Sequence, residues 1–191
     1  MMPNRQTGHL RAVEPLPAGL PRSEPAEGDP RALRDVLGRF ATGITVVTSS
    51  GQLWHGMTAN SFSSVSLDPP LVLFSVIRQS QMHDAVLANG VFAVSILGAG
   101  QEHVARHFAN PGRPDGVEQF DAVDWVPGPR TGAPLLVGAL AWLECDLNKV
   151  YDGGDHAIFL GKVLGLGRST AREALLYFAG AYHQTPSANI A

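Results

Sequence analysis

The strongest constraint on the fold is a pair of long strand-like segments joined by a short glycine-containing turn. Across residues 140–150 apolar and polar side chains alternate, with Leu143, Cys145 and Leu147 on one face and Glu144, Asp146 and Asn148 on the other. This period of two predicts a half-exposed strand with Glu144 on its polar face. Asp152-Gly153-Gly154-Asp155 then has the composition of a hairpin turn, and residues 156–166 are predicted to return as a second strand.

Further runs of β-branched and apolar residues, separated by turn residues, predict the other strands. They cover residues 44–48, 61–67, 71–77 and 91–97, with a last strand over residues 174–178. Asp68-Pro69-Pro70 must separate the second run from the third, because proline has no N–H to donate to a ladder. Strands and helices alternate irregularly, which favours a mainly β fold, a largely antiparallel barrel with a few short helices, over a parallel sheet.

Three short helices are predicted between or before these strands. Asp29-Pro30 combines an N-cap with proline at the first helical position, and apolar residues then recur at helical spacing up to Gly43. Ser80 is placed to cap a second helix, which Asn89-Gly90 would end. The third helix is predicted around residues 101–109, with Val104 and Phe108 as its apolar stripe.

Two segments have neither helical nor strand periodicity. Residues 1–28 contain five prolines among small and charged residues, which indicates a flexible or extended N-terminal arm. A single domain would then cover residues 29–191, a length that suits one hydrophobic core. Residues 110–134, rich in Pro, Gly and Asp, are predicted to form a long loop with little regular structure, and such loops are often functional.

Composition excludes several classes of protein. A formal charge of −3 at pH 7 and a pI near 6.1 lack the basic footprint of nucleic-acid binding. The sequence has no uninterrupted run of about 18 apolar residues, so no helix is expected to span a membrane. The single cysteine, Cys145, cannot form an intramolecular disulfide, and the first 30 residues lack the apolar core of a signal peptide. We therefore expect a cytoplasmic protein that binds neither membrane nor nucleic acid.

Two clusters of polar residues are candidates for ligand binding. In the first, Thr58, Ala59, Asn60 and Ser61 offer an amide, hydroxyls and accessible backbone groups to a planar heterocycle rich in hydrogen-bond acceptors. The alternative is an edge strand with solvated hydroxyls. The second cluster, residues 78–84, joins the end of a strand to the start of a helix. There Arg78 and the amides beside Ser80 are suited to a phosphate, unless Ser80 is a plain cap and Arg78 is solvated.

Two histidine patterns are candidates for chemistry. His156 follows Asp155 at the glycine turn, where it is suited to act as an acid, a base or a hydrogen-bond donor in a cleft; the alternative is a turn residue without a role. His103 and His107 have the i, i+4 spacing of helical zinc sites. Because the glutamate of the zincin motif and a third ligand are both missing, no metal is predicted. The sequence also has no Rossmann or Walker glycine pattern and no Gly-x-Ser-x-Gly motif.

In their order along the chain, these segments resemble the flavin reductase family, the small reductase components of two-component flavin-dependent monooxygenases. The segments that carry the resemblance are Phe40–Thr48 (FATGITVVT), Thr58–Leu71 (TANSFSSVSLDPPL), Phe92–Leu97 (FAVSIL), Gln101, Phe108, Gly154-Asp155-His156 and Leu176-Tyr177-Phe178. The resemblance extends from residue 31 to about residue 183. The chain departs from the family at Ala174, where the family often has proline, and in its 28-residue N-terminal arm.

The resemblance implies an antiparallel Greek-key FMN-binding split barrel, usually a homodimer with each flavin near the subunit interface. It implies an NAD(P)H-dependent flavin reductase that transfers hydride from NADH to FMN or FAD and supplies reduced flavin to a separate monooxygenase. The residues that the resemblance places at the cofactors are Thr58, Asn60 and Ser61 at the isoalloxazine and ribityl groups, Ser75, Arg78 and Ser80 near the phosphate, and His156 beside the nicotinamide, with Ala59 and Asp155 as further cofactor-binding residues.

In this scheme His156 is the catalytic residue, and it orients the nicotinamide rather than transferring a proton. The residues do not choose between FMN and FAD or between NADH and NADPH. Two alternatives stay open. One is a flavoprotein that retains FMN and reduces another acceptor, and the other is a non-enzymatic flavin- or haem-binding split-barrel module, because a fold does not fix a function.

Overall fold

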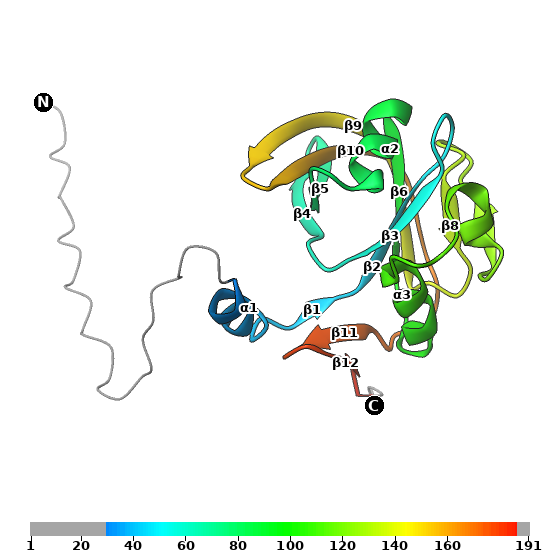
Figure 1. Cartoon of the computed structure of the whole chain (residues 1–191). Helices are drawn as coiled ribbons and strands as arrows, with labels where there is room; N and C mark the ends of the chain where they lie inside the picture. The colour runs from blue at the N-terminus through cyan, green and yellow to red at the C-terminus, as the bar shows by residue number, and fades with distance from the viewer. Residues whose placement is uncertain (1–29, 187–191) are drawn as a thin grey trace, which may run out of the picture. The chain divides into compact units, whose positions relative to one another are not determined.

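The computed structural model describes residues 30–186, and strands dominate this part of the chain (Figure 1). Every pair of neighbouring strands in it is antiparallel. The main sheet has seven strands, in the order β3 (His55–Ala59), β2 (Thr45–Ser49), β6 (Val91–Ile96), β9 (Ala141–Gly153), β10 (His156–Arg168), β5 (Pro70–Ile77) and β4 (Ser63–Leu67). The predicted mainly β, antiparallel class is therefore confirmed.

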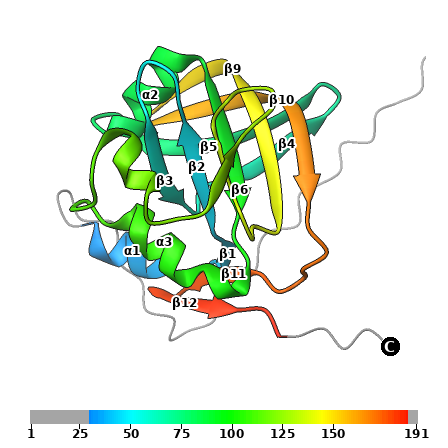
Figure 2. The ribbon, with the colours of Figure 1, turned by 90° about the vertical axis from the view of Figure 1, so that its right-hand side faces the viewer.

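The main sheet has to curl, because its two edge strands are neighbours in the sequence. Only residues 60–62 connect β3 to β4, and four extended residue steps span roughly 14 Å at most. A flat sheet would place these edges six strand spacings apart, roughly 29 Å. The sheet therefore closes on itself into an open barrel, which Figures 1 and 2 show from two directions.

Two smaller sheets and two helices complete residues 38–186. One small sheet consists of β1 (Thr42–Gly43), β11 (Leu175–Phe178) and β12 (Ala181–Gln184), and the other pairs β7 (Trp125–Pro127) with β8 (Pro134–Leu136). Helix α2 (Gln81–Asn89) lies at the upper end of the barrel in both views, and α3 (Glu102–Ala109) lies near its lower end (Figures 1 and 2). Short 3-10 turns cover Ala99–Gln101 (η1) and Gly116–Phe120 (η2). Among residues 30–186, no helix is long and apolar enough to cross a membrane.

Helix α1 (Arg31–Leu37) belongs to a unit that ends at Leu37, and none of its residues is buried. The predicted helix is too long at its C-terminal end, since Thr42 and Gly43 pair with β11 instead. Gly38 follows the helix directly, and its carbonyl accepts a hydrogen bond from the Ala179 amide. Glycine is a poor helix former, so the chain changes to sheet pairing here. The predicted N-cap Asp29 and the predicted arm over residues 1–28 lie outside the described residues.

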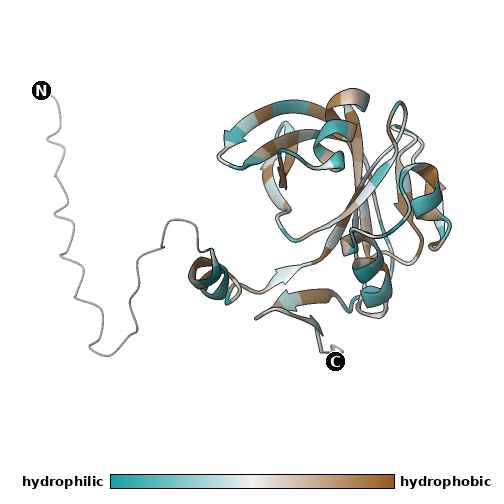
Figure 3. Ribbon diagram, in the orientation of Figure 1, coloured by the Kyte–Doolittle hydropathy of each residue, from teal (hydrophilic) through white to brown (hydrophobic). Residues whose placement is uncertain are grey.

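The barrel interior contains three fully buried phenylalanines, from β5, β6 and β10. The Phe74 ring lies 5.1 Å from the Phe92 ring and 5.4 Å from the Phe159 ring, measured between centroids. Cys145 is buried in the same cluster, and burial raises the pKa of its thiol to about 12. This cysteine is therefore an unreactive core residue, as predicted. Figure 3 shows the core strand β6 largely brown and the tip of the β9–β10 hairpin teal.

Both strands of the predicted long hairpin are present, but the prediction for Glu144 is wrong. Glu144 was expected on the exposed face of β9 and is 4% exposed. Its Oε1 accepts hydrogen bonds from the Arg130 and Thr131 amides and from the Thr131 hydroxyl. The segment around residues 128–133 folds over this face of β9, so the carboxylate is buried with its charge compensated by donors.

Five strands were not predicted from the sequence: β1, β3, β7, β8 and β12. Strand β3 has few β-branched residues, and β12 pairs only with β11, so neither has a strong local signal. The predicted loop over residues 110–134 contains η2 and the short strand β7, which pairs with β8. The predicted caps of α2 are confirmed: the Ser80 hydroxyl accepts from the His83 amide, and Gly90 ends the helix in the left-handed conformation, with φ of 69°.

Candidate functional site

A cavity of about 230 Å³ opens where the β3–β4 connection, the end of β5 and the start of β10 meet. The hairpin strand β10 reaches it because it pairs with β5 in the register His156–Ile77 and Ile158–Ser75. The residues that line the cavity are Met57, Thr58, Ala59, Asn60, Ser61, Ser75, Val76, Ile77, Ser80 and His156. Three segments far apart in the sequence therefore meet in one place.

Seven of the nine residues that the sequence analysis placed at the cofactors line this cavity. They are Thr58, Ala59, Asn60, Ser61, Ser75, Ser80 and His156. Asp155 and Arg78 do not line it; Asp155 adjoins His156 in the chain, and Arg78 lies between Ile77 and Ser80. The polar cluster after β3, the start of α2 and the glycine turn, which were separate candidates in the sequence, form one site in the fold.

Two of the lining hydroxyls hold the protein's own backbone. The Thr58 hydroxyl donates to the Ala105 carbonyl of α3 at 2.7 Å. The Ser61 hydroxyl donates to the Ser75 carbonyl at 2.9 Å and accepts from the Ser75 amide at 3.1 Å. Ser61 thus ties the β3–β4 connection to β5, as one extra pair of ladder bonds would. This explains why the two edges of the barrel stay together at the cavity.

Other polar groups of the cavity are not used in this way. The exposed Asn60 side chain and the Ser75 hydroxyl make no hydrogen bond to any residue between 30 and 186. An amide and a hydroxyl offer both donors and acceptors. These two side chains are therefore available to a polar ligand, whereas Thr58 and Ser61 mainly shape the wall.

The N-terminus of α2 contributes a different kind of group. Ser80 caps this nine-residue helix in extended geometry, with φ of −93° and ψ of 150°. The first amides of a helix carry partial positive charge and have no partners within the helix. Since Ser80 itself lines the cavity, the cap places anion-binding chemistry at the cavity wall.

His156 is held by its neighbour in the turn. Its Nδ1 lies 2.7 Å from Oδ1 of Asp155, and this hydrogen bond lowers the pKa of the Asp155 carboxyl. A carboxylate accepts, so Nδ1 carries the hydrogen of this bond. In the neutral ring, Nε2 is then an acceptor. The pair fixes both the tautomer and the orientation of the imidazole at the cavity edge.

Arg78 is directed to the glycine turn and not to the cavity. Its Nε donates to the Gly154 carbonyl at 3.0 Å, and its Nη2 lies 2.9 Å from Oδ1 of Asp152. The sequence analysis expected this guanidinium near a phosphate, and the fold gives it partners 74 and 76 residues further along the chain. No local pattern around residue 78 indicated this pairing.

Three lining residues, Met57, Val76 and Ile77, were not among the residues predicted at the cofactors, although Met57 lies within the polar segment Gly56–Phe62 that the sequence singles out. Each is a strand residue adjacent to a predicted site residue or near one in the sequence. Val76 is buried, and Ile77 is 53% exposed. Ile77 is a candidate site residue only because it pairs with His156. The sequences of β5 and β10 do not indicate that these two strands are neighbours.

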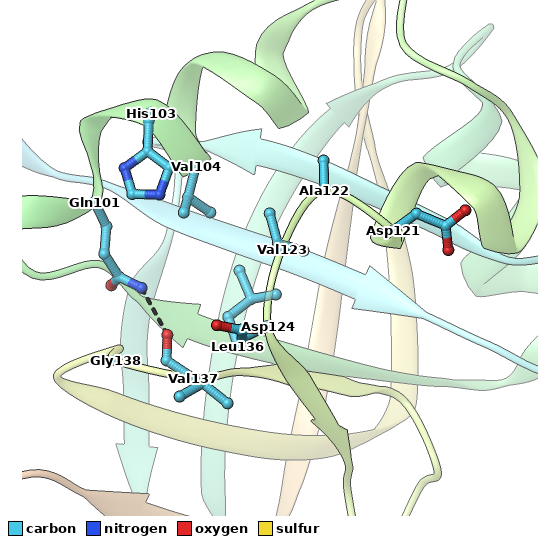
Figure 4. A pocket seen from close by; sticks show the side chains of 10 residues that line it. All are labelled: Gln101, His103, Val104, Asp121, Ala122, Val123, Asp124, Leu136, Val137 and Gly138. Atoms are coloured by element: carbon cyan, nitrogen blue, oxygen red, sulfur yellow. Dashed lines mark hydrogen bonds between the residues drawn. The ribbon is translucent and has the colours of Figure 1, made fainter.

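A second, larger cavity of about 410 Å³ lies beside α3, and none of the residues predicted at the cofactors lines it (Figure 4). Its wall mixes apolar Val104, Val123 and Leu136 with polar residues such as His103 and Asp124, and the Asp121 side chain points away from the others. The Gln101 amide is already engaged with the Val137 carbonyl. Within residues 30–186, no group of three or more His, Cys, Asp or Glu side chains is placed to hold a metal ion. His107, one of the two helical histidines, contacts the Gln119 carbonyl.

Comparison with known proteins gives consistent matches over most of the chain. The family model described as "Flavin reductase like domain" matches residues 37–186. A protein of Streptomyces globisporus described as an NADH-dependent FAD reductase is 55% identical over 152 residues, which are 80% of this chain and 84% of that protein. The reductase subunit HsaB of a flavin-dependent monooxygenase from Rhodococcus jostii is 37% identical, over 81% of this chain and 77% of that protein.

Solved structures agree with these matches. BorF, described as the flavin reductase component of a bacterial two-component tryptophan halogenase, superimposes with a TM-score of 0.81 at 51% identity, over 84% of this chain and all of that chain. The Streptomyces globisporus NADH:FAD oxidoreductase SgcE6, in complex with NAD and FAD fragments, gives a TM-score of 0.78 at 51% identity. That match covers 84% of this chain and 97% of that chain.

Proposed function

The chain belongs to the flavin reductase family and is an NADH-dependent flavin reductase, and on this premise we propose how its residues hold the two reactants. The nicotinamide and the flavin supply the hydride chemistry themselves when bound. The protein has to bind both rings, keep them in contact and orient them. The convergence of seven expected residues on one cavity is the observation that carries this assignment.

The flavin is assigned to the wall made by β3, its connection to β4, and β5. Small side chains at Ala59, Ser61 and Ser75 leave room for a flat ring, and the Asn60 amide and the Ser75 hydroxyl are available for its polar edge. The phosphate is assigned to the N-terminus of α2 at Ser80. Arg78 is given no part in phosphate binding, because its guanidinium is engaged with the glycine turn.

The nicotinamide is assigned to the Asp155–His156 end of the cavity. With its Nδ1–H donating a hydrogen bond to the Asp155 carboxylate, the His156 ring presents Nε2 to the bound nucleotide. A neutral imidazole accepts a hydrogen bond there, which suits the amide N–H₂ of the nicotinamide carboxamide. His156 therefore orients the hydride donor, and Asp155 holds His156.

A separate monooxygenase is the acceptor of the reduced flavin, as the reductase-subunit relatives indicate. FAD is the proposed flavin, because the relatives at 55% and 51% identity are described as FAD reductases. A cytoplasmic location, where NADH is abundant, belongs to the same proposal.

A homodimer is the proposed assembly. At about 230 Å³ the cavity is smaller than the roughly 300–1,000 Å³ of most ligand pockets, so one chain encloses only part of two large reactants. Four adjacent strands also expose large apolar side chains. These exposed residues, here together called the apolar strand face, are Val65 and Leu67 on β4, Ile77 on β5, Val150 and Tyr151 on β9, and Leu164 and Leu166 on β10. They do not all point to one side of the sheet, since Val150 and Tyr151 are consecutive in β9 and pair with Phe159 and Ile158. Exposed apolar patches of this kind mark interfaces.

Steady-state oxidation of NADH and of NADPH with FMN and with FAD tests this function. The expected result is flavin-dependent NADH oxidation by colourless purified protein, fastest with FAD. Protein that is yellow as purified and that reduces only another acceptor would favour a retained flavin. Flavin binding without NADH oxidation would favour a binding module.

A further inference from the structure

The turn that carries Asp155 and His156 is bound to the end of β5 by one side chain, in addition to the β10–β5 ladder that begins at His156–Ile77. Arg78, at the end of β5, donates from Nε to the Gly154 carbonyl at 3.0 Å and from Nη2 to Oδ1 of Asp152 at 2.9 Å. The same Asp152 oxygen accepts the Gly154 amide at 2.8 Å. The guanidinium therefore contacts two positions of the turn, Asp152 and Gly154, which are also bonded to each other.

The turn needs an external support, because it is short and exposed. His156 pairs with Gly153, so only Gly154 and Asp155 form its tip, and Gly154 has a φ of +80°, which favours glycine. Asp152, Gly153, Gly154 and Asp155 are all exposed. A two-residue turn of this kind is sensitive to the orientation of each peptide, and the Gly154 carbonyl that Arg78 binds belongs to the peptide that precedes Asp155.

The conformation of the turn determines how His156 is oriented in the cavity. Asp155 fixes the His156 ring through the 2.7 Å contact with Nδ1. The Arg78 amide also donates to the Asp155 carbonyl at 3.1 Å, so the side chain of Arg78 holds the Gly154–Asp155 peptide and its main chain holds the next peptide, Asp155–His156. A rotation of the Gly154–Asp155 peptide would move Asp155, and the imidazole would lose its orientation.

We propose that Arg78 is a positioning residue for NADH: its guanidinium locks the Asp152–Asp155 turn so that Asp155 can present His156 to the nicotinamide. This inference rests on the proposed function of the cavity. It gives Arg78 an effect on the nucleotide and none on the flavin, although the residue lies only two positions before the cap of α2.

The chemistry of the contacts requires arginine. Guanidinium is a planar fork that donates in two directions at once, here to a carbonyl and to a carboxylate, whereas lysine is a point donor on a flexible stem. The contacts with Gly154 and Arg78 lower the pKa of the Asp152 carboxyl, so Asp152 is charged throughout the neutral range. Both partners are solvent-exposed, so the ion pair contributes little to global stability, and its effect is on the local geometry of the turn.

The test compares Arg78→Ala, Arg78→Lys, Asp152→Ala and the double variant Arg78→Ala/Asp152→Ala in the intact protein. Flavin affinity is measured by titration without nucleotide, and NADH oxidation by steady-state kinetics. Arg106→Ala is the matched control, because that exposed guanidinium pairs with Glu102 on α3 and does not contact the turn. Hydrogen exchange of the peptide that covers residues 150–158 reports on the turn itself.

Arg78→Ala is expected to raise the KM for NADH roughly tenfold, with the flavin dissociation constant within about twofold of wild type. Exchange in the turn should become faster, Arg78→Lys should recover part of the KM, and the double variant should be no worse than Arg78→Ala alone, because both residues act through one turn. Arg106→Ala should match wild type in every measurement.

Three results would overturn the proposal. Weaker flavin binding by Arg78→Ala with an unchanged KM for NADH would mean that Arg78 binds the flavin phosphate instead. Unchanged kinetics in Arg78→Ala, with wild type active, would leave the side chain without a role in positioning. Wild-type protein that oxidises no NADH with any flavin would remove the proposed function itself, and with it this role.

Discussion

At the scale of single residues, the cavity lining contains side chains that bind the protein's own backbone and side chains whose polar groups are available. Ser61 and Thr58 hold backbone carbonyls, whereas Asn60 and Ser75 keep their polar groups available. His156 combines both kinds of contact, since one ring nitrogen binds Asp155 and the ring lines the cavity. A substitution here is informative only when its effects on flavin and on nucleotide are measured separately.

His156→Ala should act on the nucleotide. Loss of one positioning hydrogen bond costs on the order of 1–3 kcal/mol, or roughly ten- to a hundredfold in kcat/KM for NADH. Flavin affinity should barely change, because the groups assigned to the flavin are on β3, β5 and α2. Stopped-flow measurement of flavin bleaching separates NADH binding from hydride transfer. An unchanged rate together with unchanged NADH affinity would make His156 a turn residue.

The buried His55, at the start of β3, is expected to make the stability of the protein depend on pH. Nη2 of Arg113 lies 2.9 Å from its Nε2, and since arginine only donates, the buried imidazole is neutral there. Burial, and secondarily the charge of Arg113, lowers the pKa of His55 from 6.5 to about 4. Between pH 6.5 and 4 the imidazole is protonated in the unfolded chain and neutral in the folded one. The contribution of His55 to stability is therefore fully present above pH 6.5 and is lost as the pH falls towards 4.

The unfolding free energy is expected to fall by about 2 kcal/mol over this pH range, less than the full pKa shift would give, because solvent partly screens the charge of His55. Urea unfolding between pH 4.5 and 7.5 measures it, and His55→Gln, which keeps an acceptor but does not titrate, should flatten the dependence. If the unfolding free energy of wild type and of His55→Gln depended equally on pH, groups other than His55 would cause the dependence.

At the scale of elements, β3 depends on its neighbours more than on its own sequence. Its Gly56 amide donates to Oε1 of Gln119 at 2.7 Å, and Nη2 of Arg113 donates to the Gly56 carbonyl. The Gly56 Cα also packs against Phe108 of α3 and Phe120 of η2. The strand is therefore held between β2 and the segment after α3, and it presents Met57, Thr58 and Ala59 to the cavity from a fixed support.

Gly56→Ala should destabilise the protein. A Cβ at this position would lie 2.5 Å from Cε1 and 2.7 Å from Cδ1 of Phe108, so the ring has to move. Overpacking of this kind costs about 1–3 kcal/mol. Thermal or urea unfolding measures the loss, and Gly43→Ala is the control, since no atom lies within 4 Å of its added Cβ. Equal stability of the two variants would mean that the β3–α3 contact is not tightly packed.

At the scale of the whole molecule, the closed main sheet and the apolar strand face have different consequences. Closure brings β3 and β4 together and creates the cavity. The apolar strand face lies on β4, β5, β9 and β10, which are adjacent in the sheet, and Leu67 on it is 94% exposed. Burying such side chains against a second copy would be favourable by roughly 1.5–3 kcal/mol for each one that is fully covered.

Sedimentation at micromolar concentration should therefore report a dimer. Leu67→Asp should shift the protein towards monomer and reduce activity, because a charge would be buried at the interface. Val126→Asp on β7 is the control: this residue is 51% exposed and lies outside the apolar strand face. A wild-type monomer with full activity would contradict the proposed assembly.

The sequence by itself determined the local features of this protein. The β9–β10 hairpin, the Ser80 and Gly90 caps of α2, and the apolar stripe of α3 follow from side-chain periodicity and turn chemistry, which act over a few residues. The mainly β class follows from the same signals. The candidate residues themselves could be found only as separate motifs and through a family resemblance.

The tertiary structure decided which of these features meet. Strand neighbours such as β10 and β5 are chosen by packing over the whole chain, so no local signal pairs His156 with Ile77 or directs Arg78 to Asp152. The burial of Glu144 depends on the segment 128–133, which begins 16 residues earlier, and β3 forms because α3 and η2 support it. Each of these outcomes is set by contacts between segments distant in the sequence, and these contacts exist only once the sheet has closed.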